Sequence, residues 1–348
     1  MAVSYVLIIA QSGRMLAALA KQADENTLVI DLFADEDTLA LANHYSQVAT
    51  LVLDTIKPLL MRLKEQFNII KVVYGSGLEQ YPETLAYLQH NFKVCGCDVM
   101  DIDFQGLDAL NINYPAVSFY YPDEPEKWLI KSFQSAGGMG VSGCDRKIVL
   151  GEYYQRFCAG ILGSALFVAN GKDVQIIGFH RQWSVSDTDF RFAGIIQYQG
   201  YPEQLQALVY AWLIELVAHY DIQGLGSLDF IVNGERCYFL ELNLRPPASA
   251  MLYPELPLWQ LHTESLVDFI VPEIDEISAM QVMYATQDYA IGELQWPDWC
   301  VDRPQKQSNI KKNEPLCSIM ASEISVKSTL ACLSQRQAVI ENNINLGR

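Results

Sequence analysis

The stretch SLDFIVNGERCYFLELNLRPPAS, residues 227–249, decides how the rest of the chain is interpreted. Its second half, Arg236–Asn243, alternates between polar and apolar residues, which is typical of a β-strand. Side chains on a strand point to opposite faces in turn, so Glu241, Asn243 and then Arg245 project from one face. The stretch therefore predicts a rigid strand that presents a carboxylate, an amide and a guanidinium together.

A partner strand precedes it over Ser227–Val232, and the turn between the two contains Asn-Gly. The length of this turn decides where Asp229 points. A three-residue loop, Asn233–Glu235, places Asp229 opposite Phe239 and diagonal to Glu241, whereas a two-residue loop sends Asp229 to the other face. We expect the three-residue loop, in which the central glycine supplies a positive φ.

Carboxylate and amide oxygens are hard ligands, and such ligands grouped on a rigid sheet beside an arginine suit Mg²⁺ that bridges nucleotide phosphates. The alternative is a surface hairpin with scattered charges. The hairpin alone leaves both interpretations open, so the rest of the chain has to decide between them.

The composition excludes several classes of protein. The chain has 348 residues, of which 50% are hydrophobic and 19% charged, so it is long enough for two or three domains with substantial cores. The net charge of −17 argues against non-specific binding to nucleic acid or to acidic lipid.

The apolar start of the chain has no basic segment before it and is interrupted at Gln11–Arg14, so we expect neither a signal peptide nor a membrane span. Eight dispersed cysteines fit reduced thiols in a cytoplasm.

Strands and helices alternate over the first hundred residues, which predicts an α/β domain with a parallel sheet covered on both faces. The expected strands are Val3–Ala10, Thr27–Asp31 and Asn68–Tyr74, and the expected helices are Met15–Lys21, a segment starting at Asp35, and Pro82–His90. The glycine turns at 11–13 and 75–77 lack the full dinucleotide-binding spacing, and ordinary strand-to-helix turns explain them at least as well.

The pattern then changes to short strands that predict a small antiparallel unit, followed by a larger mixed segment. We expect strands over Trp128–Ser132, Glu152–Cys158, Ala165–Ala169 and Val174–Phe179, helices over Gln204–His219 and Leu258–Phe269, and a β-rich tail that ends in a helix over Thr329–Asn343.

Lys131 ends an apolar strand just before the glycine-rich loop Ala136–Val141. Glycines let backbone N–H groups approach phosphate oxygens closely, and a lysine adds a positive charge. The loop is not a Walker A loop, and a simple turn with a lysine nearby is the alternative. The strand end at Gln155–Gly160 is a candidate hinge whose backbone could bind adenine.

The segments WLIKSFQSAGGMGV, YYQRFCAG and GLGSLDFIVNGERCYFLELNLRPPAS, in this order, resemble the ATP-grasp superfamily. The resemblance covers about Asn113–Leu261 and is strongest to the carboxylate–amine ligase branch. It implies an ATP-grasp fold with four parts: an N-terminal α/β domain (1–105), a small antiparallel lid subdomain (106–162), a larger central subdomain with the carboxylate hairpin (163–280), and a β-rich C-terminal extension (281–348).

The resemblance also implies roles for individual residues, with ATP and Mg²⁺ bound and with Mn²⁺ as a substitute for Mg²⁺. A phosphate-binding lysine is implied at Lys131, and a flexible lid over the γ-phosphate at Gly137, Gly138 and Gly140. The adenine side of the hinge is implied at Gln155, Phe157 and Cys158, the metal ligands at Asp229, Glu241 and Asn243, and stabilisation of the transferring phosphoryl group or the acyl phosphate at Arg245.

The chain departs from the family pattern in three places. Arg156 stands where the family usually has a glutamate, no acid lies near Ala159 or Ser164 to bind the ribose, and Phe104–Tyr114 contains no second phosphate-binding lysine. These departures bear on nucleotide affinity more than on the metal ligands.

Two further arginines, Arg181 and Arg191, flank the segment HRQWSVSDTDFRF and suit a carboxylate substrate, with solvated loop charge as the alternative. Gln182 stands where the ligases that the chain resembles often carry glutamine. His180 could serve as a base, but a hydrogen-bonded core histidine is the better expectation in an apolar strand.

The predicted function is an ATP-dependent ligase that converts a carboxylate into an acyl phosphate and couples it to an amine. A weaker similarity, to ATP-grasp ligases that make one-carbon carriers, points to cofactor biosynthesis. One alternative is a nucleotide-binding regulatory protein, and another is a biotin-carboxylase-like enzyme that uses carboxyphosphate, which the tail suggests. The expected partners are the small-molecule carboxylate and amine, with a homodimer as the default assembly and with no nucleic acid or membrane.

Overall fold

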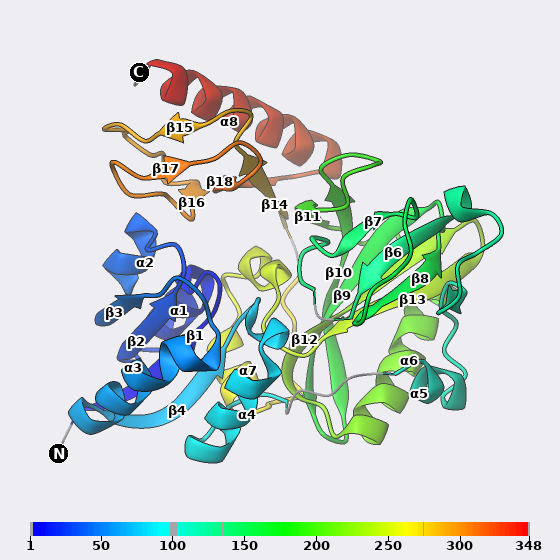
Figure 1. Ribbon diagram of the computed structural model, residues 1–348, viewed down its shortest axis with the longest axis horizontal. Coiled ribbons are helices and arrows are strands. Elements are labelled where there is room, and N and C mark those ends of the chain that lie inside the picture. The colour runs from blue at the N-terminus through cyan, green and yellow to red at the C-terminus, as the bar shows by residue number, and fades with distance from the viewer. Residues whose placement is uncertain (1–2, 98–102, 134, 274, 347–348) are drawn as a thin grey trace.

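A computed structural model of the chain describes residues 3–97, 103–133, 135–273 and 275–346 (Figure 1). Its N-terminal part contains a parallel sheet with the strand order β3-β2-β1-β4. The strands are β1 (Ser4–Ile9), β2 (Thr27–Asp31), β3 (His44–Gln47) and β4 (Asn68–Tyr74), and the helices are α1 (Arg14–Gln22), α2 (Glu36–Leu41), α3 (Leu53–Gln66), η1 (Leu78–Gln80) and α4 (Pro82–Asn91).

This sheet is buried on both faces, as the sequence predicts. Val6 and Ile8 pack into a core with α1, whereas Leu7 and Ile9 pack into a second core with α3 and α4. Helices on both faces explain why these strands are almost continuously apolar. The carboxyl ends of β1 and β4 meet at one edge, where the Gln11 N–H donates to the Ser76 carbonyl at 2.8 Å.

The second sheet is small, antiparallel and ordered β5-β8-β6-β7. Its strands are β5 (Val117–Ser118), β6 (Trp128–Ser132), β7 (Val141–Gly143) and β8 (Glu152–Arg156), and α5 (Phe104–Ala109) and η2 (Pro125–Lys127) precede it. Ile130 and Tyr154 face a small core with Cys144. We call this sheet the lid sheet.

The third sheet has eight antiparallel strands in the order β13-β12-β9-β10-β11-β14-β18-β16. Its strands are β9 (Ile161–Asn170), β10 (Val174–Ser184), β11 (Phe192–Gln197), β12 (Gln223–Asn233), β13 (Arg236–Asn243), β14 (Ile277–Tyr284), β16 (Cys300–Val301) and β18 (Pro315–Glu323). The helices that accompany it are α6 (Glu203–Tyr220), η3 (Ala248–Leu252), α7 (Leu258–Thr263) and α8 (Val326–Leu346). We call it the central sheet.

The two faces of the central sheet have different neighbours. Helix α6 covers one face, where Phe167 and Phe230 pack with Trp212. On the other face, Leu166 and Val168 share a core with residues of η3, α7 and the N-terminal sheet. The N-terminal domain is therefore packed directly against the face of the central sheet that is opposite to α6.

Two of the expected domain boundaries fall inside strands. The position 162/163 lies within β9, and 280/281 lies within β14. The tail continues the central sheet through β14 and β18, which α8 covers, while β15 (Tyr289–Ala290) and β17 (Asn309–Ile310) form a separate pair. Figure 1 shows this last part of the chain beside the N-terminal domain.

The predicted elements agree with the structure at β2, β4, β6 and β13, whose limits coincide with those expected. The helix expected to run to Phe269 ends at Thr263 because the backbone turns left-handed at Ser265 and Asp268, with φ of 51° and 68°. Within the described residues, no helix is both long and apolar enough to cross a bilayer.

Candidate functional site

The hairpin β12–β13 carries Asp229 and Glu241, but its turn differs from the expected one. Asn233 pairs with Arg236, so the loop has two residues and the expectation of a three-residue loop is wrong. A two-residue loop by itself would send Asp229 to the other face. A β-bulge at Leu240 inserts one extra residue and restores the parity, so that Asp229 pairs directly with Glu241.

The bulge separates two environments along the same pair of strands. On the turn side of the bulge, Phe230 pairs with Phe239, and both rings are buried on the α6 face of the sheet. On the other side, Asp229 and Glu241 project from the opposite face. The bulge therefore lets one strand bury its phenylalanine and still present its carboxylate toward the N-terminal domain.

Hydrogen bonds connect Asp229 to β10 directly and to η1 through Asn243 and Arg245. Gln182 on β10 donates from Nε2 to Asp229 Oδ1 at 3.2 Å, and Asn243 donates from Nδ2 to Asp229 Oδ2 at 3.4 Å. Arg245 donates from Nη2 to Asn243 Oδ1 at 3.1 Å and from Nε to Glu79 Oε1 at 2.9 Å. Glu79 lies in η1, directly after the glycine turn that follows β4, so the N-terminal domain contributes to the site.

Burial and crowding of like charges shift the pKa values in this group. Burial, together with the Glu241 charge, raises the pKa of Asp229 to about 7. Desolvation by surrounding protein also raises the pKa of Glu241, although solvent reaches this residue, and Lys131 and Arg245 act in the opposite direction. For Arg245, burial opposes the charge, but Glu79 and Glu241 outweigh it and raise the guanidinium pKa. A site that penalises two carboxylates in this way favours a bound cation.

Lys131 belongs to the lid sheet and acts on the hairpin from across the site. Burial lowers the pKa of its ammonium group, while the charges of Glu241 and then Asp229 raise it. Lys131 therefore lies within electrostatic range of both carboxylates. The lid sheet and the hairpin are far apart in the sequence, and the fold brings their charged groups close together.

The glycine-rich loop of the lid sheet connects β6 to β7 and lies against the segment before β11. Gly137 and Gly138 have φ of 61° and 73°, a region that favours glycine. A Cβ on Gly138 would lie 2.0 Å from the Phe190 carbonyl oxygen, and one on Gly140 would lie 2.4 Å from Ser135 Cβ. The Phe192 N–H donates to the Gly137 carbonyl at 2.9 Å. A glycine at 138 lets the loop lie against the segment before β11, and a glycine at 140 lets the loop fold closely on itself.

The candidate hinge follows β8. Gln155 is buried and pairs with Leu129, and so lies on the same face of the lid sheet as Lys131. The Phe157 N–H donates to the Lys127 carbonyl at 2.8 Å. Cys158 is only partly buried, and the next residue, Ala159, accepts a 2.7 Å hydrogen bond from Asn233 in the tip of the carboxylate hairpin. The hinge is thus tied to the same hairpin that carries Asp229.

Residues 104–249 match the sequence profile of the ATP-grasp domain. This chain carries an ATP-grasp domain. The matched segment contains the lid sheet, the hinge and the carboxylate hairpin, and so includes each group described above except Glu79.

Several solved structures share the fold over nearly the whole chain. Biotin carboxylase from Campylobacter jejuni is 12% identical with a TM-score of 0.73, and the match covers 95% of this chain and 90% of that one. N5-carboxyaminoimidazole synthetase from Staphylococcus aureus, complexed with ADP, is 11% identical with a TM-score of 0.71, covering 95% and 96%. L-amino acid ligase from Bacillus licheniformis is 11% identical with a TM-score of 0.70, covering 97% and 98%. A sequence comparison with curated proteins found no match.

Arg181 and Arg191 lie apart from the carboxylate pair of the ATP-grasp domain. Arg181 pairs in register with Gly163, which places it on the α6 face, where its guanidinium stacks 3.6 Å from the centroid of the Tyr198 ring. Arg191 binds Asp189, with Nε 2.9 Å from Oδ1. The structure does not bring either arginine to Asp229 and Glu241.

His180 occupies the core of the ATP-grasp domain. It is fully buried, and its Nε2 lies 2.9 Å from the Tyr253 hydroxyl. Burial lowers the pKa of the imidazole to about 3, so the ring is neutral at physiological pH. This agrees with a hydrogen-bonded core histidine rather than a base.

The sequence analysis missed one site residue, Glu79, and the position of Arg156 differs from what its place in the sequence suggested. Glu79 was hidden because its only signal is a short glycine turn at the carboxyl end of β4, which also suits an ordinary turn. Arg156 looked unfavourable for the hinge, but it pairs with Trp128 and lies on the outer face of the lid sheet. There it lines a shallow depression with Trp128 and Glu124, away from Lys131.

The donor set of the hairpin fits a hard divalent cation. Asp229 and Glu241 supply carboxylate oxygens, and Asn243 supplies an amide oxygen that Arg245 shares. Within the described parts of the chain, no three histidine, cysteine or carboxylate side chains are grouped as a closed metal site. An open set of this kind suits Mg²⁺, which retains water and phosphate oxygens as ligands.

Proposed function

We propose that this protein is an ATP-dependent ligase that activates a carboxylate as an acyl phosphate and couples it to an amine. The observation that carries this proposal is the arrangement of Lys131 on the lid sheet within electrostatic range of Asp229 and Glu241 on the hairpin. Binding of nucleotide alone would not require these groups together with Arg245.

The nucleotide would lie between the lid sheet and the hairpin. Lys131 would bind phosphate oxygens, and the loop containing Gly137, Gly138 and Gly140 would cover the γ-phosphate. On the adenine side, Gln155, Phe157 and Cys158 line the hinge. Because the Phe157 N–H already donates to Lys127, we propose that the Cys158 N–H is the hinge donor for adenine.

The same hairpin would hold the metal. Asp229, Glu241 and Asn243 would be its protein ligands, and Mg²⁺ would supply positive charge that offsets the phosphate charges during transfer. Mn²⁺ is expected to substitute because it takes the same oxygen ligands.

The reaction proceeds in two displacements. A carboxylate oxygen of the substrate attacks the γ-phosphorus, the bond from this phosphorus to the β,γ-bridging oxygen breaks, and ADP leaves. The amine nitrogen then attacks the carbonyl carbon of the acyl phosphate, loses a proton as the C–N bond forms, and releases inorganic phosphate. Lys131 and Arg245 stabilise the negative charge that develops, and the closed lid excludes water that would hydrolyse the acyl phosphate.

Arg245 is our candidate for orienting the substrate carboxylate. Its guanidinium is buried and already organised by Glu79 and Asn243, so it offers a fixed fork. Arg181 and Arg191 are engaged elsewhere in this structure and are weaker candidates. We further propose that the protein works in the cytoplasm, where its eight free cysteines remain reduced, and that it forms a homodimer.

The structural neighbours include a biotin carboxylase and an N5-carboxyaminoimidazole synthetase, so bicarbonate belongs among the carboxylates to be tested. The experiment measures the release of ADP and phosphate from Mg-ATP with a panel of carboxylates and amines. Glu241→Gln is the test variant, and Glu235→Gln, an exposed glutamate in the turn of the same hairpin, is the matched control.

We expect release that requires both a carboxylate and an amine, is lost in Glu241→Gln and is retained in Glu235→Gln. Release with bicarbonate alone would favour a carboxyphosphate enzyme. Tight Mg-ATP binding without turnover on any pair would favour a regulatory nucleotide-binding protein. Undiminished turnover of Glu241→Gln would contradict the assigned site.

A further inference from the structure

Tyr153 lies next to Lys131 on the inner face of the lid sheet. The two residues pair directly across β6 and β8, so their side chains project from the same face. The neighbouring residue Tyr154 projects from the opposite face, where its hydroxyl accepts a hydrogen bond from the Ile148 N–H at 2.9 Å. Tyr153 therefore faces the site, and Tyr154 faces the small core of the lid.

Aromatic neighbours hold the Tyr153 ring in place. Its centroid lies 4.7 Å from that of Phe133 and 5.2 Å from that of Phe104. Only 7% of the residue is exposed. A ring packed in this way has little freedom to reorient, so the position of its hydroxyl is preorganised.

No hydrogen bond of the Tyr153 hydroxyl is found among the residues that the structure describes, and its oxygen does not belong to the buried polar atoms that are closed off from solvent without a partner. The ring is buried, whereas the hydroxyl is left without a protein partner on the face that also carries Lys131. A phenylalanine would fill the same space but would offer no hydrogen bond to a bound group. A group bound in the site is the partner that the protein itself does not provide.

The Glu241 carboxylate acts electrostatically on Tyr153. Burial and then Glu241 raise the pKa of Tyr153 far above its usual value, so the phenol stays protonated and remains a hydrogen-bond donor. The same carboxylate acts on Lys131. Tyr153, Lys131 and Glu241 therefore surround one space, which is the space assigned above to the phosphates.

The segment Phe104–Tyr114 explains why a tyrosine would be used. It contains no lysine, and instead contributes Phe104, which packs on Tyr153, and Tyr114, which packs on Phe104 at 5.2 Å. An aromatic support thus occupies the region from which a second cation could have come.

We propose that the Tyr153 hydroxyl donates a hydrogen bond to a phosphate oxygen of the nucleotide bound between the lid sheet and the hairpin. This inference rests on the proposed function, since it requires a nucleotide in that space. Tyr153 would then be a direct phosphate ligand beside Lys131.

The test compares Tyr153→Phe with Tyr154→Phe and Tyr114→Phe in the full-length protein. Tyr154 is the adjacent residue on the other face, and Tyr114 belongs to the same aromatic group but donates to Asp108 at 2.9 Å. Calorimetry measures the affinity for Mg-ADP, and urea denaturation measures the stability of each ligand-free variant.

We expect Tyr153→Phe to bind Mg-ADP about tenfold more weakly, because hydrogen bonds to charged groups are among the stronger ones, while both controls bind as the wild type does. The ligand-free Tyr153→Phe variant should be at least as stable as the wild type. Unchanged affinity in Tyr153→Phe would overturn the inference and leave the proposed function intact.

Two other results would also decide the matter. Weaker binding accompanied by an equal loss of ligand-free stability would assign Tyr153 to packing and overturn the inference. A folded wild-type protein that does not bind Mg-ADP would overturn the proposed function and this inference with it.

Discussion

The surroundings of Asp229 disfavour the ionised form of its carboxyl group. It lies opposite Glu241 in the hairpin, is partly buried, and has a pKa raised to about 7. The hydrogen bonds from Gln182 and Asn243 lessen this penalty but do not remove it. Groups that carry such a penalty are common at sites that bind a ligand, because the ligand relieves it.

The ligand-free protein should become less stable as the pH rises, because Asp229 then loses its proton in surroundings that disfavour the charge. An unfolded aspartate titrates near pH 3.9, so between about pH 4 and pH 7 the native state binds more protons than the unfolded state, and stability falls across this range. We expect Asp229→Asn to be more stable than the wild type by about 1–3 kcal/mol at pH 8 and similar to it at pH 4. Urea denaturation at both pH values measures this, with Asp173→Asn, an exposed control. A gain of equal size at both pH values would argue against the assigned pKa.

If Asp229 is a metal ligand, as we propose, its raised pKa should make metal binding depend on pH. Below about pH 7, binding of Mg²⁺ with nucleotide must displace the proton from Asp229, so affinity should fall as the pH is lowered from 8 to 6. Calorimetry in two buffers of different ionisation enthalpy counts the protons released. We expect close to one proton at pH 6 and few at pH 8. The Asp229→Asn variant should show no such release, and release that persists in it would place the titrating group elsewhere.

Arg245 depends on the planar shape of its guanidinium. Its Nε binds Glu79 and its Nη2 binds Asn243, and a single ammonium group cannot reproduce both directions. We expect Arg245→Lys to lower the rate of ADP release about a hundredfold. Arg236→Lys, at the exposed start of β13, the strand that Arg245 follows, should retain the wild-type rate, and equal rates in both variants would remove Arg245 from the mechanism.

At the scale of elements, the hairpin and the lid loop both depend on local backbone irregularity. The bulge at Leu240 changes the parity of β13, so that Glu241 rather than its neighbour faces Asp229. The loop after β6 uses positive φ angles at Gly137 and Gly138 to lie against the segment before β11. Both features place functional groups that a regular strand or turn would direct elsewhere.

A side chain at Gly138 should detach the lid loop. A Cβ there would collide with the Phe190 carbonyl, and its φ of 73° is unfavourable for any other residue. We expect Gly138→Ala to lower the rate of ADP release at least tenfold with the fold retained, because water enters the site. Gly143→Ala in the same sheet has open space around its Cβ and should be nearly neutral, whereas normal activity in Gly138→Ala would show that this contact is dispensable.

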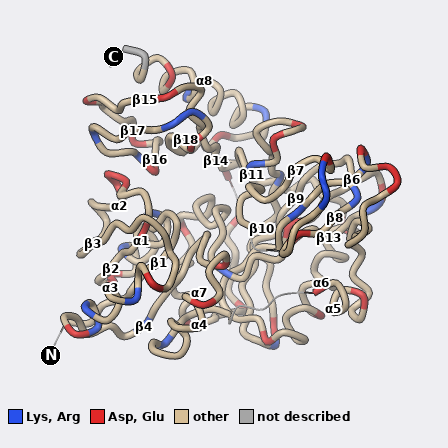
Figure 2. The backbone as a smooth tube through the Cα atoms, in the orientation of Figure 1, with Lys and Arg blue, Asp and Glu red and all other residues tan. Residues whose placement is uncertain are grey.

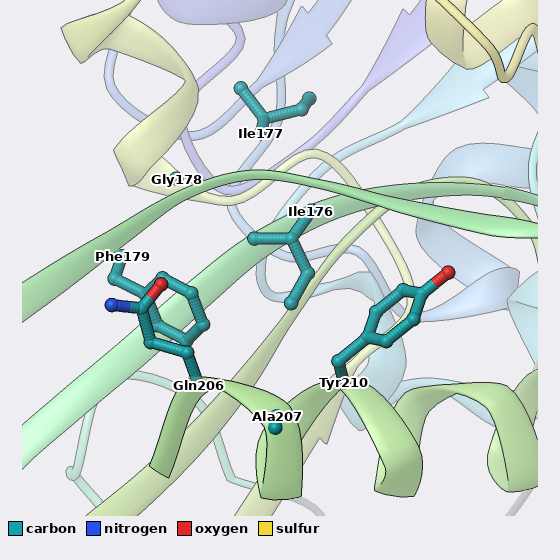
Figure 3. A pocket seen from close by; sticks show the side chains of 7 residues that line it. All are labelled: Ile176, Ile177, Gly178, Phe179, Gln206, Ala207 and Tyr210. Atoms are coloured by element: carbon teal, nitrogen blue, oxygen red, sulfur yellow. The ribbon is translucent and has the colours of Figure 1, made fainter. Parts of the chain in front are cut away.

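The surface of the central domain also includes a shallow depression between β10 and α6. Figure 3 shows Gln206, Ala207 and Tyr210 of α6 facing Ile176 and Phe179 of β10 across it. It lies on the α6 face of the sheet, away from Asp229 and Glu241, so we assign it no part in the reaction.

At the scale of the whole molecule, the last part of the chain is connected to the first. The Arg14 guanidinium in α1 is largely buried and donates from Nε to Asp302 Oδ1 at 2.9 Å. The backbone N–H groups of Asp302 and Arg303 donate to the Asp37 carboxylate in α2 at 2.9 and 3.0 Å. Figure 2 shows acidic and basic segments where α2 faces the C-terminal strands. These contacts fix the N-terminal domain relative to the central sheet.

Removal of one partner should weaken this connection. Asp302→Asn removes the nearest carboxylate from the Arg14 guanidinium and leaves Asp37, 3.9 Å away, as its remaining anionic partner. A buried charge that is only partly compensated costs about 1–3 kcal/mol. We expect this loss in urea denaturation at pH 7. The control is Glu293→Gln, which breaks an exposed ion pair to Lys306 and should change little. Equal stability of both variants would show that Arg14 finds another partner.

Much of the fold and of the candidate site was predictable from local pattern. The limits of β2, β4, β6 and β13 follow from hydrophobic alternation and from the turn residues that flank them. The grouping of Glu241, Asn243 and Arg245 follows from alternation alone. These features depend on residues close in sequence, so one sequence contains the information needed.

Tertiary structure decided the rest. The sequence determined which chemical groups the chain carries and which strands carry them, because strand periodicity is a local property. It could not determine that the bulge at Leu240 returns Asp229 to Glu241, that Glu79 reaches Arg245, that Arg181 lies on the α6 face, or that β14 and β18 extend the central sheet. Each of these depends on strand register and on packing between segments far apart in the chain, where the free energy of the whole arrangement selects the contacts.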